Sequence, residues 1–222
     1  MYDVQAFRET RTEVMHALIR AHPLATLVVM TGQGLEANHV PLLMGASLAH
    51  DGSPDLGTLC GHVARANPLW RTFKADCEAL AVFQGPQGYV TPSWYPSKAE
   101  HGKVVPTWNY AMVHAYGPLV IHDDVEWLRG LVTRLTQSQE ASRVRPWQVT
   151  DAPADYVDAM LKAIVGIEIP VRRIEGKWKM SQNRLPRDRD GVINALTSQS
   201  DKDSAAMLRA MGEAALAGVK PA

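Results

Sequence analysis

Residues 24–44 read LATLVVMTGQGLEANHVPLLM, and this stretch decides the fold class. Two runs of apolar and β-branched residues, 24–31 and 35–44, flank the turn sequence at 32–34, a pattern typical of a β-hairpin. The two glycines also match the loose G-x-G-x-x-A fingerprint of dinucleotide-binding folds. That fingerprint requires a helix directly after the glycines, whereas an extended pattern with Pro41 follows here. The stretch therefore predicts an antiparallel hairpin.

The rest of the chain continues this mainly antiparallel pattern. We predict further strands at residues 56–63, 78–84 with a continuation at 88–90, 107–122 with an interruption at Gly117-Pro118, and 166–175. We predict a first helix that begins at the capping box Thr10-x-x-Glu13 and ends before His22-Pro23. We predict further helices from Asp123-x-x-Glu126 onward and at 151–164, 188–198 and 203–216, with a structured loop at 92–102. Because strands do not alternate regularly with helices, we expect an α+β fold built on an antiparallel β-barrel with peripheral helices. We expect a barrel domain at 1–183 and a helical C-terminal extension at 184–222.

The composition is that of a neutral globular protein. Lys and Arg number 23 and Asp and Glu number 23 in 222 residues, so the chain has no global attraction for nucleic acids or anionic membranes. The N-terminal residues lack the apolar segment of a signal peptide, and no run approaches the ~18 apolar residues of a membrane span. Cys60 and Cys77 have no second pair, and metal-binding motifs are absent from the sequence. We therefore expect a cytoplasmic protein with two thiols and no metal site.

The segment Gly61–Trp70, GHVARANPLW, is a candidate phosphate-binding site. Arg65 stands where a predicted strand gives way to a turn at Asn67-Pro68. A guanidinium fork beside free backbone N–H groups suits a phosphate dianion. Two structural roles remain open on the residues alone: Arg65 pairs with a carboxylate at the barrel rim, and His62 is an interior histidine with satisfied hydrogen bonds.

Two other segments have the composition of a ligand site. Residues 83–110 combine aromatic side chains with amides, which an isoalloxazine ring needs on its faces and along its pyrimidine edge. The alternative is a loop fixed by its own aromatic residues. Residues 177–184, KWKMSQNR, could cover an anionic ligand, contact DNA phosphates or form a solvated basic face.

Five strings spread over nearly the whole chain carry a family resemblance. They are EANHVPLL at 36–43, GHVARANPLW at 61–70, PSWY at 92–95, VPTWNY at 105–110 and GKWKMSQNR at 176–184. With them the chain resembles the PaiB-type family of FMN-binding negative transcriptional regulators, which is similar to the pyridoxamine-oxidase-like split barrels. The resemblance implies a six-stranded split β-barrel that binds flavin mononucleotide (FMN) at a homodimer interface.

The resemblance also implies which residues bind the cofactor. His62, Arg65 and Asn67 fall in the phosphate region, and Gln84 falls near the flavin edge. Trp108 and Asn109 fall near the dimer seam, and Lys179, Gln182 and Asn183 complete the site from either subunit. The pyridoxamine-oxidase members carry an Arg-Lys pair where this chain has His62 and Arg65, which puts the strength of phosphate binding in question.

Three functions follow from these features as alternatives. The first is transcriptional repression, with DNA contact through the basic residues Lys177, Lys179, Arg184, Arg187 and Arg189, although no helix-turn-helix pattern is evident. The second is a flavin-dependent oxidoreductase that uses NAD(P)H on a small substrate, with His39 and His114 as candidate acid–base groups. The third is a haem-handling split barrel with one histidine as axial ligand.

Overall fold

The computed structural model describes residues 1–2, 4–45 and 56–217. The chain divides into two compact units: unit 1 comprises Met1–His22, Phe83–His114 and Glu175–Ala222, and unit 2 comprises Pro23–Val82 and Ala115–Ile174. Among the helices of the described residues, none has the length and apolarity needed to cross a membrane.

Ten strands of the described residues form two sheets. Their order is β1-β10-β7-β6-β2-β3 in a six-stranded sheet and β4-β5-β9-β8 in a four-stranded sheet. The bounds are β1 (Arg8–Glu9), β2 (Leu24–Thr31), β3 (Gly34–Pro41), β4 (Leu43–Gly45), β5 (Thr58–Ala64), β6 (Ala79–Val90), β7 (Thr107–Gly117), β8 (Val120–His122), β9 (Ile164–Pro170) and β10 (Arg173–Lys179).

Helices connect and flank these strands. The α-helices are α1 (Thr12–Ala21), α2 (Leu69–Thr72), α3 (Ser97–His101), α4 (Val125–Glu140), α5 (Ala154–Lys162), α6 (Pro186–Gln199) and α7 (Lys202–Ala217). Short 3-10 turns are η1 (Gln5–Phe7), η2 (Pro92–Trp94) and η3 (Val149–Asp151). The expected C-terminal extension consists of α6 and α7, and the domain boundary at residue 183 stays a prediction.

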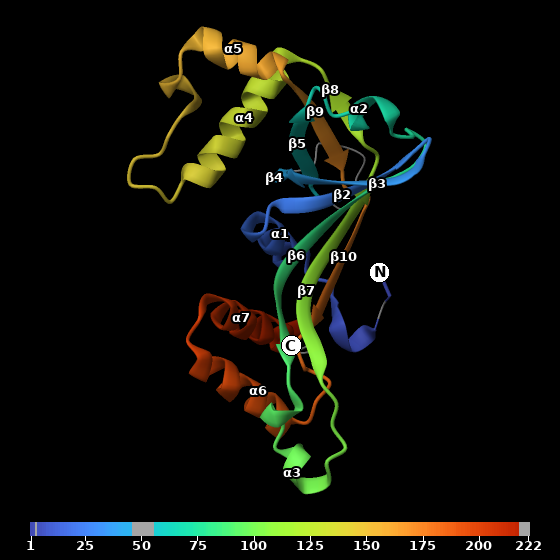
Figure 1. Ribbon diagram of the computed structural model, residues 1–222, viewed down its shortest axis with the longest axis vertical. Helices are drawn as coiled ribbons and strands as arrows, with labels where there is room; N and C mark the ends of the chain where they lie inside the picture. The colour runs from blue at the N-terminus through green and yellow to red at the C-terminus, as the bar shows by residue number, and fades with distance from the viewer. Residues whose placement is uncertain (3, 46–55, 218–222) are drawn as a thin grey trace. The chain divides into compact units, whose positions relative to one another are not determined.

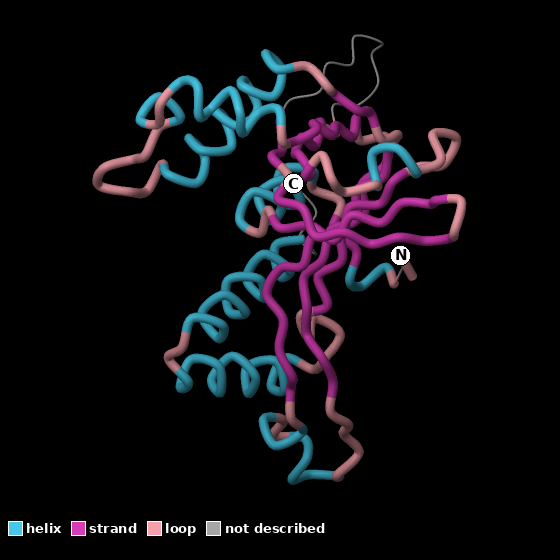
Figure 2. Tube along the Cα trace, turned by 45° about the horizontal axis from the view of Figure 1, so that its top comes forward, coloured by secondary structure: helices cyan, strands magenta, loops and turns pink. Residues whose placement is uncertain are grey.

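In unit 2, the hairpin that opened the sequence analysis is confirmed. Strands β2 and β3 pair antiparallel from Leu24↔Pro41 to Thr31↔Gly34, and Figure 2 shows them joined by a tight turn. Helices α4 and α5 lie side by side (Figure 1) and bury Leu128, Val157 and Leu161 in a common cluster. The glycines at 32–34 therefore serve a hairpin and not a dinucleotide-binding helix.

In unit 1, α1 lies close against the sheet because glycines on the strands leave room for it. A Cβ on Gly85 of β6 would lie 2.7 Å from Leu18 Cδ1, and a Cβ on Gly176 of β10 would lie 2.8 Å from Met15 Sδ. Helices α6 and α7 pack on each other beside the ends of β6 and β7 (Figure 1).

The predicted interruption at Gly117-Pro118 is confirmed, because the segment at 107–122 divides into β7 and β8 at Pro118, which has no N–H for a ladder hydrogen bond. Two other strand predictions were too long, because each predicted strand changes sheets. The predicted strand at 166–175 divides into β9 and β10, and the N–H of Arg172 donates to the carbonyl of Tyr116 at 2.9 Å. The predicted strand at 35–44 likewise divides into β3 and β4.

The capping box at Thr10-x-x-Glu13 was wrong. Helix α1 begins after Arg11, which caps it without a side-chain hydrogen bond. The backbone N–H of Arg11 donates to Glu9 Oε1 at 2.9 Å, and the Arg11 guanidinium also donates to the Glu9 carboxylate. The buried carboxylate of Glu9 thus holds both the backbone and the side chain of Arg11 at the start of the helix.

Gly166 of β9 offers a test of the packing in unit 2. A Cβ there would lie 2.3 Å from Cζ3 of Trp127. We expect Gly166→Ala to lower the free energy of unfolding by about 1–3 kcal/mol, as overpacking does, measured by urea denaturation. The control is Gly212→Ala in α7, where a Cβ meets nothing within 4 Å, so that variant should gain up to about 1 kcal/mol from helix propensity. Equal stabilities of the two variants would contradict this packing.

Candidate functional site

Arg65 is held by protein oxygens at the end of β5. Its Nη1 and Nη2 donate to the two carboxylate oxygens of Asp123 at 2.9 and 2.5 Å. Its Nε donates to the carbonyl of Lys162 at 2.6 Å, and Nη2 also donates to the carbonyl of Ile164 at 3.0 Å. The hydrogen bond with Asp123 raises the pKa of Arg65 and lowers the pKa of Asp123. This geometry favours the structural role that the sequence left open, in which Arg65 pairs with a carboxylate at the barrel rim.

His62, on the same strand, is not the satisfied interior histidine of the other alternative. Its Nδ1 is buried and has no hydrogen-bond partner among the described residues. Burial lowers the pKa of His62 below its ordinary value of 6.5, so the ring is neutral at pH 7. A buried nitrogen without a partner is costly unless a ligand or a water molecule supplies one.

Asn67 and its neighbours form the turn that follows β5. Asn67 Oδ1 accepts from the N–H of Leu69 at 2.9 Å, and its Nδ2 donates to Asn38 Oδ1 at 2.8 Å. The amide of Asn67 therefore shapes the start of α2.

Arg71, which the sequence analysis missed, lies one turn further along α2. Its guanidinium stacks on the ring of Trp70, 4.1 Å from the ring centroid. It is exposed and makes no hydrogen bond or ion pair with any residue that the structure describes. Arg71 is thus the cation of this segment that is open to an anion. Its position directly after the quoted string GHVARANPLW was the signal that could have found it.

In unit 1, the predicted residues Gln84, Trp108 and Lys179 lie on β6, β7 and β10, which are neighbouring strands of one sheet. Gln84 is exposed and its amide has no partner in the described chain. Trp108 is 49% exposed, and its Nε1 donates to Gln87 Oε1 at 3.2 Å. Lys179 Nζ donates to the Trp108 carbonyl at 2.7 Å. Burial lowers the pKa of Lys179, and the nearby cations Arg184 and Lys177 lower it further.

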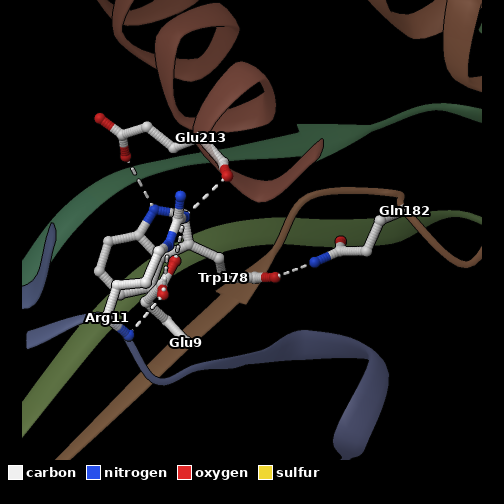
Figure 3. Close-up of polar contacts among 5 residues, drawn as sticks. All are labelled: Glu9, Arg11, Trp178, Gln182 and Glu213. Carbon is white, nitrogen blue, oxygen red and sulfur yellow. Dashed lines mark hydrogen bonds and ion pairs between the residues drawn. The ribbon is translucent and has the colours of Figure 1, made fainter. Parts of the chain in front are cut away.

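The other three predicted residues of unit 1 differ in role. Asn109 is fully buried, and its Nδ2 donates to Ser181 Oγ at 2.9 Å. Gln182 accepts from the N–H of Met180 at 2.6 Å and donates to the carbonyl of Trp178, as Figure 3 shows for the latter contact. Both amides thus shape the turn after β10. Asn183 is exposed and keeps its amide free of contacts within the described residues.

These residues match the chemistry of FMN, unit by unit. In unit 1 an exposed indole, a free amide and a lysine meet the needs of a flat ring with a polar edge. In unit 2 the open Arg71 guanidinium is a group that a phosphate dianion accepts from, and the unpartnered Nδ1 of His62 is buried. Each unit therefore carries groups that suit one part of FMN, although Arg65, Asn67, Asn109 and Gln182 are already used within the protein.

The predicted basic cluster is largely committed to internal contacts. Lys177 is buried, and its Nζ donates to the carbonyl of Tyr2 at 3.0 Å. Arg187 pairs with Glu100 at 2.7 Å, and the Arg184 guanidinium lies 5.0 Å from the ring centroid of Tyr95. These residues are therefore engaged by contacts within the chain.

The two histidines proposed for chemistry belong to different units. His39 is exposed on β3, with Nδ1 3.2 Å from Thr26 Oγ1, whereas His114 belongs to unit 1. Within residues 1–2, 4–45 and 56–217, no group of three or more His, Cys, Asp or Glu side chains is arranged to hold a metal ion.

Comparison with known proteins gives matches of three kinds. A sequence profile of the family described as "Putative FMN-binding domain" matches residues 1–173. Protein AN0679 of Emericella nidulans is 35% identical over 246 residues, covering 96% of this chain and 98% of that protein. "Protease synthase and sporulation protein PAI 2" of Bacillus subtilis is 33% identical over 212 residues, covering 95% and 96%. The structure of the flavocytochrome Anf3 from Azotobacter vinelandii superposes with a TM-score of 0.54 at 12% identity, covering 78% of this chain and 69% of that chain.

These matches confirm the expected family, its cofactor FMN and the split-barrel fold. The structural match, at its low identity, supports the fold alone.

The different contacts of Arg65 and Arg71 lead to a prediction. Arg65→Lys loses the fork to Asp123, so we expect a lower Tm of the FMN-free protein and little change in FMN affinity. Arg71→Gln should leave that Tm unchanged and raise the Kd for FMN about 10-fold or more, as loss of a charge-assisted contact does. Differential scanning calorimetry and fluorescence titration measure the two quantities. The opposite pattern, with Arg65→Lys weakening only FMN binding, would make Arg65 the phosphate ligand.

Proposed function

Because the chain belongs to the PaiB-type family of FMN-binding proteins, we propose that it is a homodimeric flavoprotein that acts as a negative regulator of transcription. The observation that carries this proposal is the similarity to the Bacillus protein along nearly the whole length of both chains. The proposal places the protein in the cytoplasm, where its two free thiols, Cys60 and Cys77, stay reduced.

Each accessible residue has a stated part in this proposal. Bound FMN supplies a redox-active isoalloxazine ring and a phosphate dianion. In unit 1, the indole of Trp108 offers a flat apolar surface to a flavin ring, and the amide of Gln84 offers hydrogen bonds to a polar ring edge. In unit 2, the Arg71 guanidinium offers charge-assisted hydrogen bonds to a phosphate, and His62 carries a neutral ring.

A half-exposed apolar surface on unit 2 supports the homodimer. Val28 of β2 lies opposite Leu80 of β6 and Ala37 of β3, so their side chains share one face of the sheet. Leu35, on the same face, is 75% exposed. A second copy of this chain would remove this apolar area from water.

FMN binding is the first test of the proposal. The protein, purified gently, should show a flavin absorption spectrum or quench added FMN at one FMN per chain, and denaturation should release FMN and not FAD. Trp108→Ala should raise the Kd for FMN about 3- to 10-fold, the range of an aromatic contact. Trp147→Ala is the matched control, because Trp147 is 48% exposed and Trp108 is 49% exposed.

Three results would contradict parts of the proposal. A colourless protein that fails to quench FMN would remove the flavin. A mass by light scattering equal to the 24.4 kDa chain, and not twice that value, would remove the homodimer. Steady-state NADPH oxidation with added FMN and a small acceptor would favour the oxidoreductase over the regulator.

The mode of regulation is tested by the salt dependence of DNA binding. Most residues of the basic cluster already make contacts within the chain. We therefore expect weak binding to DNA from upstream of the protein's own gene, and a slope of log K against log salt concentration no steeper than about −2. A mobility-shift series across salt concentrations measures it. A slope of about −6 or steeper would reveal a phosphate-binding surface that the described contacts do not provide, and would restore direct DNA contact as the mechanism.

A further inference from the structure

A cavity of about 410 Å³ opens in unit 1 between α1 and α7. Its volume falls within the range of small-molecule sites. Ala17 of α1 lines one wall, Ala206 and Ala210 of α7 line the opposite wall, and Ala111 and Trp178 of the sheet form the floor. The alanine methyl groups on these walls occupy less space than larger side chains would. The two helices therefore leave the cavity open above the sheet.

The indole of Trp178 is fixed at the floor of this cavity. Trp178 is 2% exposed, and its Nε1 donates to Glu213 Oε2 at 3.0 Å. Figure 3 shows this contact together with the hydrogen bond from Arg11 Nη2 to the Glu213 carbonyl, which is 2.9 Å long. The floor is therefore a rigid aromatic surface, suited to a planar apolar group.

The charges at the cavity leave one cation without a partner. Arg209 lines the cavity and makes no hydrogen bond or ion pair with any residue in the described part of the chain. Glu213 also lines the cavity: its Oε2 accepts from the indole N–H of Trp178, and its backbone carbonyl accepts from Arg11. Burial lowers the pKa of His22, which keeps its ring neutral at pH 7. The Arg209 guanidinium is therefore the group of the lining whose donors suit a carboxylate.

We propose that this cavity binds a small monocarboxylate with a flat apolar body. The body lies against Trp178 between the alanines of α1 and α7, and the carboxylate accepts from the Arg209 guanidinium. Side chains alternate along β10, so Trp178 faces away from Lys177 and Lys179. The site is therefore separate from the flavin candidate Lys179, and the proposal does not depend on FMN binding.

The experiment is calorimetric titration of the full chain with 2-naphthoate, and with the neutral analogue 2-naphthalenemethanol. The wild type should bind naphthoate at least 10-fold more tightly than the alcohol. Ala206→Leu fills the cavity and should weaken naphthoate at least 10-fold. Ala205→Leu, on the exposed side of the same helix, is the matched control and should bind as the wild type does. Arg209→Gln should abolish the preference for the carboxylate.

Four outcomes would overturn the proposal. They are no binding of naphthoate at 5 mM to the folded protein, equal binding by Ala206→Leu and the wild type, an unchanged preference in Arg209→Gln, and displacement of naphthoate by saturating FMN. The last outcome would put the probe in the flavin site. If Ala206→Leu fails to fold, Arg209→Gln still decides the question, because this exposed side chain makes no contact on which folding depends.

Discussion

The close approach of Gly117 to the carbonyl of Pro170 is the constraint on which the chain path through both sheets depends. A Cβ at residue 117 would lie 2.1 Å from that carbonyl oxygen, a distance that no side chain tolerates. At this point β7 ends and β8 begins in the other sheet, and β9 ends shortly before β10 returns to the first sheet. The N–H of Arg172 secures the crossing on the carbonyl of Tyr116. Without a glycine at 117 the two chain segments could not pass so closely.

Arg65 and Arg71, near the end of β5, carry the same guanidinium group but use it for different contacts. Arg65 has its fork on Asp123, because α4 begins just beyond that carboxylate and brings it within 2.5 Å of Nη2. Arg71 stacks on Trp70 and keeps its donors open. A guanidinium binds carboxylate and phosphate with the same geometry. The string GHVARANPLW predicted a phosphate-binding site with Arg65 as its cation, whereas the fold pairs Arg65 with Asp123 and leaves the donors of Arg71, directly after the string, open.

Side chains alternate between the two faces of β10, so Trp178 lies on the opposite face of the strand from Lys177 and Lys179. One face of the strand carries Lys179, which contacts the carbonyl of the exposed Trp108. The other face carries the indole that floors the cavity under α7. A ligand on each face would bind the same strand from opposite sides.

Sequence alone determined the antiparallel class, the hairpin at 24–41, the family and its cofactor, because period-two patterning, turn glycines and long shared strings are local properties. Trp108 and Gln84 were also predicted this way as flavin-binding residues, and the structure leaves both accessible. Only the tertiary structure decided that Asp123 pairs with Arg65, that Ser181 bonds Asn109 and that Arg71, directly after the GHVARANPLW segment, stays open. Those partners lie 58 and 72 residues away along the chain. A hydrogen bond between residues so distant depends on how sheets and helices pack, and no local pattern records it.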